Sequence, residues 1–82
     1  MDIVKGSVVI AKAGRDKGRA FAVTDVISER EVLIADGKSR PLERPKRKNV
    51  IHLQATSTVI DRATTNRQLR NLLREHNFIQ EG

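Results

Sequence analysis

Cysteine, tryptophan and tyrosine are absent from this chain of 82 residues, and phenylalanine occurs only twice. Without cysteine, the chain can form neither a disulfide framework nor a thiolate metal site. No apolar stretch is long enough to cross a membrane, and the first residues, MDIVKGSVVIAKAG, lack the apolar core of a signal peptide. These absences favour a small cytoplasmic protein that consists of one domain.

The scarcity of aromatic residues also limits how the chain could bind a ligand. Proteins that hold single-stranded nucleic acid stack its bases on aromatic side chains, and aromatic cages hold methylated lysine. Two phenylalanines do not supply such surfaces, and Phe21 lies in an apolar run that predicts a place in the core. A nucleic-acid partner would therefore be contacted through its phosphates, its sugars and the shape of a folded RNA.

Positive charge is abundant instead, because 16 Lys and Arg residues face 10 Asp and Glu residues and give a net charge of +6. The first basic segment, residues 12–19 (KAGRDKGR), holds four cations and one acid. The second basic segment, residues 38–48 (KSRPLERPKRK), holds six cations and one acid, and the remaining residues are net negative. Charge concentrated in this way indicates a polyanionic partner, most often nucleic acid.

No group of residues indicates catalysis. The two histidines, His52 and His76, are far apart and lack the spacing of metal ligands, so we expect partly buried structural roles, although His52 could also contact a phosphate. The serines lack any motif that would activate a hydroxyl group. Gly14 and Gly18 are not followed by the helix that a nucleotide-binding P-loop requires. We therefore expect no enzymatic activity, no cofactor and no bound metal.

Short β-branched runs separated by turns predict a mainly β fold. Strands are expected at 7–12, 20–27 and 31–35, followed by a two-residue hairpin turn at Asp36-Gly37 that returns residues 38–40 beside the third strand. Prolines 41 and 45 confine residues 41–48 to a loop or a sheet edge, and NVIHL at 49–53 predicts a last strand. Five short strands with tight turns predict a small barrel.

The C-terminal part predicts one helix. Thr65 and Gln68 have the spacing of a capping box, which predicts a helix over 66–76, whereas residues 54–63 could either extend a strand or lie against the barrel. The side expected to pack on the barrel comprises Leu69, Leu72, Leu73 and His76. The opposite side comprises Arg67, Arg70 and Arg74. We expect a barrel over residues 1–54 and a C-terminal extension over residues 55–82.

Two longer stretches resemble known families. GSVVIAKAGRDKGRAFAVTDV, from Gly6 to Val26, resembles a KOW motif, with Gly18 at the place of the loop glycine of that motif. VLIADGKSRPLERPKRKNVIHL, from Val32 to Leu53, is similar to the large-subunit ribosomal protein family numbered fourteen of the eukaryotic and archaeal type. The resemblance covers about residues 4–54. It implies an SH3-like barrel of about five strands that binds ribosomal RNA.

The basic segments and the resemblance together predict an RNA-binding surface. The expected contact residues are Lys12, Gly14, Arg15, Lys17, Gly18, Arg19, Arg40, Arg44, Lys46, Arg47, Lys48 and His52, with Arg67, Arg70 and Arg74 as a secondary RNA-facing set. We expect a monomer whose partner is ribosomal RNA or the large ribosomal subunit, and no membrane partner. The alternative is a protein-interaction module of the KOW type, as in transcription or translation factors. Residues 55–82 do not match the extension of the ribosomal protein, which leaves a ribosomal component, an assembly factor and a stand-alone RNA binder all open.

Overall fold

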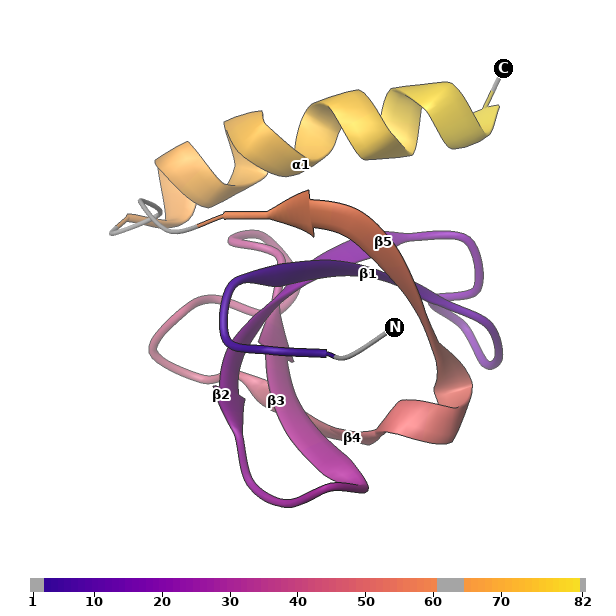
Figure 1. Cartoon of the computed structure of the whole chain (residues 1–82). Helices are drawn as coiled ribbons and strands as arrows, with labels where there is room; N and C mark the ends of the chain where they lie inside the picture. The colour runs from indigo at the N-terminus through magenta and orange to yellow at the C-terminus, as the bar shows by residue number, and fades with distance from the viewer. Residues whose placement is uncertain (1–2, 61–64, 82) are drawn as a thin grey trace.

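The computed structural model describes residues 3–60 and 65–81, with side chains as far as residue 74. Its elements are β1 (Ser7–Ala11), β2 (Ala20–Val26), β3 (Glu31–Ala35), β4 (Lys46–Asn49), the 3-10 turn η1 (Val50–His52), β5 (Leu53–Val59) and α1 (Asn66–Glu81) (Figure 1). The strands form one antiparallel sheet in the order β4-β3-β2-β1-β5. The sheet curls until its two edge strands meet at η1, and α1 crosses over it (Figure 1). This arrangement confirms the predicted mainly β, barrel-like fold with a C-terminal helix.

Alternation along the strands produces two apolar layers, because successive side chains of a strand point to opposite faces. The layer inside the barrel comprises Val9, Ala11, Phe21, Val23, Val32, Ile34 and Leu53. The layer outside the barrel comprises Val8, Ile10, Ala20, Ala22, Ala35, Leu69 and Leu73. Since α1 covers the outer face, all five residues of β1 are buried. Phe21 lies in the inner layer, as its apolar context predicted.

The helix packs through fewer leucines than its periodicity predicted. Leu69 and Leu73 are fully buried against the sheet, but Leu72 is 43% exposed. A helix that packs on one face of a sheet buries one stripe of its surface, here Leu69 and Leu73, and Leu72 lies to the side of this stripe. The side chain of His76 lies outside the part of the chain whose side chains are described. Neither proline nor glycine interrupts residues 77–81, and the helix continues past its expected end at residue 76 to Glu81.

The predicted hairpin at Asp36-Gly37 is wrong, since residues 38–40 form no strand and Lys46–Asn49 pairs with β3 instead. A two-residue turn of that type requires positive φ at both positions, but only Gly37 has one, at 78°. The Asp36 carboxylate accepts hydrogen bonds from the backbone N–H groups of Lys38 and Arg40, both at 2.8 Å. The side chain thus builds a wider turn than the dipeptide alone would make.

The predicted strand over 49–53 is also wrong. Asn49 accepts a hydrogen bond from the backbone N–H of Ile51 at 3.0 Å, and this bond caps η1. The 3-10 turn carries the chain around the corner from β4 to β5, so β5 begins at Leu53 and runs to Val59, past residue 54. Ile60 is partly buried against the outer layer. No helix among the described residues is long and apolar enough to span a membrane.

Candidate nucleic-acid interface

The first basic segment forms the loop between β1 and β2, and three local backbone hydrogen bonds shape its second half. The N–H of Lys17 donates to the carbonyl of Gly14 at 3.2 Å, that of Gly18 to Ala11 at 2.8 Å, and that of Arg19 to Asp16 at 2.9 Å. Both glycines have positive φ, 79° at Gly14 and 87° at Gly18, as expected for a tight loop. The N–H groups of Lys17, Gly18 and Arg19 are therefore engaged by backbone carbonyls and are not available to a phosphate.

The second basic segment comprises two turns and an edge strand. Asp36 closes the first turn, and the second turn, around Glu43, is attached to the start of α1 by Asn66. The side chain of Asn66 accepts a hydrogen bond from the N–H of Leu42 at 2.7 Å and donates to both carboxylate oxygens of Glu43 at 2.9 and 3.2 Å. Leu42 packs against the outer apolar layer. The PLER stretch is therefore held at both its backbone and its side chains.

The cations of the edge strand β4 do not share one face. Lys46 lies opposite Ile34 and Lys48 opposite Val32, so both lie on the face that borders the barrel interior. Arg47 lies on the other face and pairs with Glu31, with 2.9 Å between Nε and Oε2. The run Lys46-Arg47-Lys48 is continuous in sequence, but its charges point in two directions.

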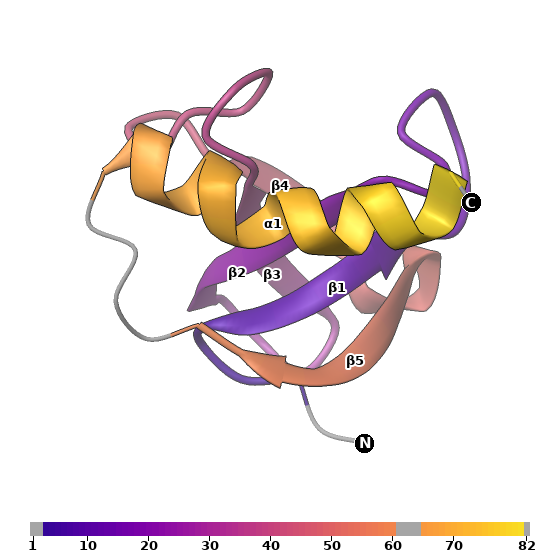
Figure 2. The same ribbon diagram turned by 90° about the horizontal axis from the view of Figure 1, so that it is seen from above.

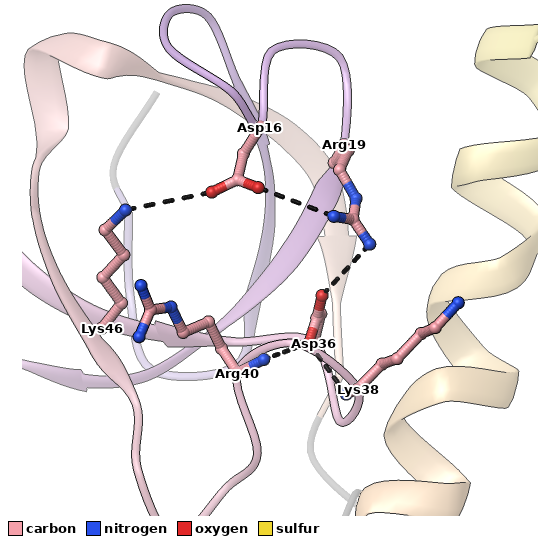
Figure 3. A network of polar contacts seen from close by, with 6 residues as sticks. All are labelled: Asp16, Arg19, Asp36, Lys38, Arg40 and Lys46. Atoms are coloured by element: carbon pink, nitrogen blue, oxygen red, sulfur yellow. Dashed lines mark hydrogen bonds and ion pairs between the residues drawn. The ribbon is translucent and has the colours of Figure 1, made fainter.

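Two aspartates connect the basic segments to each other (Figure 3). The Asp16 carboxylate lies 3.9 Å from the Lys46 Nζ and 3.6 Å from the Arg19 guanidinium. Arg19 in turn lies 3.7 Å from the buried Asp36 carboxylate. The chain of charges Lys46, Asp16, Arg19 and Asp36 therefore runs from β4 through the first loop to the end of β3. It brings together segments that are separated by about 20 residues of sequence.

The helix adds further cations beside this network. Arg67, Arg70 and Arg74 are exposed on α1, as the helical periodicity predicted. A groove of about 310 Å³ lies between α1 and the two basic segments, and its lining comprises Arg19, Asp36, Lys38, Arg70, Leu73 and Arg74. Arg67 does not line this groove. Figure 2 shows the loops of both basic segments projecting from the same side of the barrel.

The remaining expected contact residues do not take part in the ion pairs of Asp16 and Asp36. Arg15, Lys17 and Arg44 are exposed on loops, and Arg40 extends from the Asp36 turn toward Lys46, away from α1 (Figure 3). His52 lies in η1, not in a strand, and is exposed, so the expectation of a partly buried histidine is wrong. Its carbonyl accepts a hydrogen bond from the N–H of Lys12 at 2.8 Å, which places these two residues side by side.

Sequence reasoning omitted two kinds of residue from the interface. One kind is acidic or neutral: Asp16 and Asp36 pair with cations, and Glu43 and Asn66 hold the second turn against α1. Reasoning that counted positive charge could not select them, although the Asp-Gly pair at 36–37 signalled a turn. The other is Lys38, which lines the groove and directly follows that turn.

Comparison with known proteins finds similarity to ribosomal proteins. Large ribosomal subunit protein eL14 of Staphylothermus marinus is 38% identical over 56 residues, which cover 68% of this chain and 58% of that relative. The eL14 proteins of Pyrobaculum islandicum and Pyrobaculum calidifontis are each 36% identical over 56 residues, which cover 68% of this chain and 54% of each relative. The chain thus spans little more than half the length of these curated relatives, and no family model matches it. The predicted resemblance is confirmed in this sense: the chain is similar to the ribosomal protein eL14 over about two thirds of its own length.

Proposed function

We propose that this chain is a non-catalytic, cytoplasmic RNA-binding protein that contacts structured ribosomal RNA through its two basic segments. The similar proteins are named as components of the large ribosomal subunit. The observation that carries the proposal is the pairing of Asp16 and Asp36 with Arg19 and Lys46, which joins the two basic segments on one small body. A rigid arrangement of cations loses little conformational entropy on binding.

The mode of contact follows from what the surface offers. The core residue Phe21 is 1% exposed, so it provides no platform for a base. Arginine and lysine side chains on folded loops instead suit phosphate groups, whose spacing is regular only in a structured RNA. The protein would therefore recognise the position of phosphates in a folded RNA, and base sequence would contribute little.

A salt series tests the electrostatic basis of this proposal. We would measure binding to a hairpin RNA of about 20 base pairs and to a poly(U) single strand in increasing monovalent salt. With about six phosphates contacted, log K should fall with log salt at a slope of about −5 for the hairpin. A flat salt response, or equal affinity for both RNAs, would contradict the proposal.

The identity of the RNA needs a measurement in cells. Ultraviolet crosslinking followed by sequencing of the bound RNA should recover large-subunit ribosomal RNA above messenger RNA. Recovery of a protein partner that survives nuclease treatment, with no crosslinked RNA, would instead favour the protein-interaction module.

A further inference from the structure

The groove between α1 and the basic segments has the composition of a phosphate site. Among the side chains that the structure describes, four cations line it, Arg19, Lys38, Arg70 and Arg74, together with the carboxylate of Asp36. Leu73, which is buried between α1 and the sheet, also lines it. Cations gathered around a concave surface attract an anion together, because their fields add in the groove.

The Asp36 carboxylate in the groove accepts backbone hydrogen bonds, and the cations around the groove keep donors for a further anion. Asp36 Oδ1 accepts two backbone hydrogen bonds at 2.8 Å, so part of its negative charge is offset by N–H dipoles. Arg19 lies 3.6 and 3.7 Å from Asp16 and Asp36, beyond the N–H to O distance of about 2.7–3.2 Å that hydrogen bonds prefer. The aspartates therefore orient the Arg19 guanidinium without saturating its N–H donors, which a phosphate could accept from directly.

The helix wall of the groove is positioned by close packing. Gly37 lies against the start of α1, where an added Cβ would collide with the Asn66 carbonyl and lie 3.2 Å from Cγ of Arg70. The stem of Arg70 therefore passes directly over Gly37, next to the turn that carries Lys38. Figure 3 shows Lys38 extending from this turn toward α1. Helix and turn thus present their cations to a common space.

We propose that this groove binds a phosphate group of the RNA backbone, so that α1 contributes a third element of the RNA-binding surface. This inference rests on the proposed function and deepens it, because it assigns a defined phosphate contact to Arg70 and Arg74. The forked guanidinium groups of Arg19, Arg70 and Arg74 suit two-point hydrogen bonding to phosphate oxygens, while Lys38 acts as a point charge.

The test compares two double variants of equal charge. Arg70→Gln/Arg74→Gln removes the helix wall of the groove, whereas Lys5→Gln/Arg30→Gln removes two exposed cations that do not line it and are not among the expected RNA contacts. Binding to the hairpin RNA would be measured in a salt series, with thermal unfolding as a check on folding. The groove variant should bind about 30-fold more weakly at about 0.15 M salt, and its salt slope should be shallower by about one unit, because one phosphate contact is lost. The control variant should lose only a few-fold.

Further variants separate the possible outcomes. Arg70→Lys/Arg74→Lys retains charge and helix stability but lacks the guanidinium fork, so it should restore only part of the affinity. Equal losses in the groove and control variants would overturn the phosphate site and leave the proposed function standing. Loss of binding in a Lys12→Ala/Arg15→Ala/Lys17→Ala variant, with full binding in the groove variant, would overturn the site in the same way. Failure of the wild-type protein to bind the hairpin would refute the proposed function itself.

Discussion

Replacing Gly37 with alanine tests whether close contact between the Asp36 turn and α1 holds the helix in place. Gly37 has φ of 78°, and the new Cβ would meet the Asn66 carbonyl oxygen, with the Asn66 carbonyl carbon at 3.1 Å and Arg70 Cγ at 3.2 Å. The positive φ alone costs about 1–2 kcal/mol for a residue with a Cβ. The collision is with helix backbone, which cannot rotate away, so α1 must shift and overpacking adds about 1–3 kcal/mol.

Gly14→Ala provides the matched control. Gly14 has nearly the same φ, 79°, but an added Cβ there has no heavy atom within 4 Å. This variant should therefore lose only the backbone term of about 1–2 kcal/mol. The difference between the two variants isolates the contact with the helix, independent of the shared conformational cost.

Urea unfolding followed by circular dichroism measures both variants. Gly37→Ala should lower the free energy of unfolding by about 2–5 kcal/mol in total, and Gly14→Ala by only about 1–2 kcal/mol. The Gly37 variant should also bind the hairpin RNA more weakly, since a shifted α1 moves Arg70 away from the turn. Equal destabilisation by the two substitutions would refute the reasoning, because it would show that the helix does not press on Gly37.

Three further predictions concern the core and the charge network. Leu73→Ala should lower the free energy of unfolding in urea by about 2–5 kcal/mol, because Leu73 is buried. Leu72→Ala should lower it by less than about 1 kcal/mol, because Leu72 is 43% exposed. Similar losses would place both leucines in the core. Lys46→Ala should weaken binding to the hairpin RNA more than Arg47→Ala, since Arg47 lies on the opposite face in an ion pair with Glu31. A larger loss of affinity in Arg47→Ala would count against an interface centred on Asp16. Asp16→Asn should lower RNA affinity a few-fold in a low-salt titration, because it frees Arg19 and Lys46 from the carboxylate that positions them. It should change stability by less than about 1 kcal/mol, because its ion pairs are partly exposed; a gain of affinity would mean that the two cations need no positioning by Asp16.

Local patterns predicted the elements whose stability is local. The strands at 7–11, 20–26 and 31–35 follow from β-branched runs between turns. The capping box also formed as predicted, with Gln68 N–H donating to Thr65 Oγ1 at 3.1 Å and Thr65 N–H donating to Gln68 Oε1 at 3.2 Å. These features depend on residues within a few positions of each other, so the local sequence is enough to predict them.

The predicted hairpin at 36–37 and the predicted strand at 49–53 are wrong because a polar side chain there binds the backbone in place of a strand partner. Asp36 and Asn49 each bind nearby backbone N–H groups, and so convert a predicted hairpin and a predicted strand into wider turns. Propensity favours such bonds in general, but whether they form depends on the partner strands around them. The exposure of Leu72 likewise depends on how α1 lies on the sheet.

The sequence by itself determined that the protein is small, basic, poor in aromatic residues and mainly β, and that its excess charge lies in two segments. It also contained the similarity to eL14. Only the tertiary structure decided which cations lie together. Strand alternation separates Arg47 from Lys46, and aspartates 16 and 36 join segments that are distant in the chain. The helix then adds Arg70 and Arg74 to the same groove. The reason is physical: charge is a property of single residues, whereas an anion site depends on the distances between them.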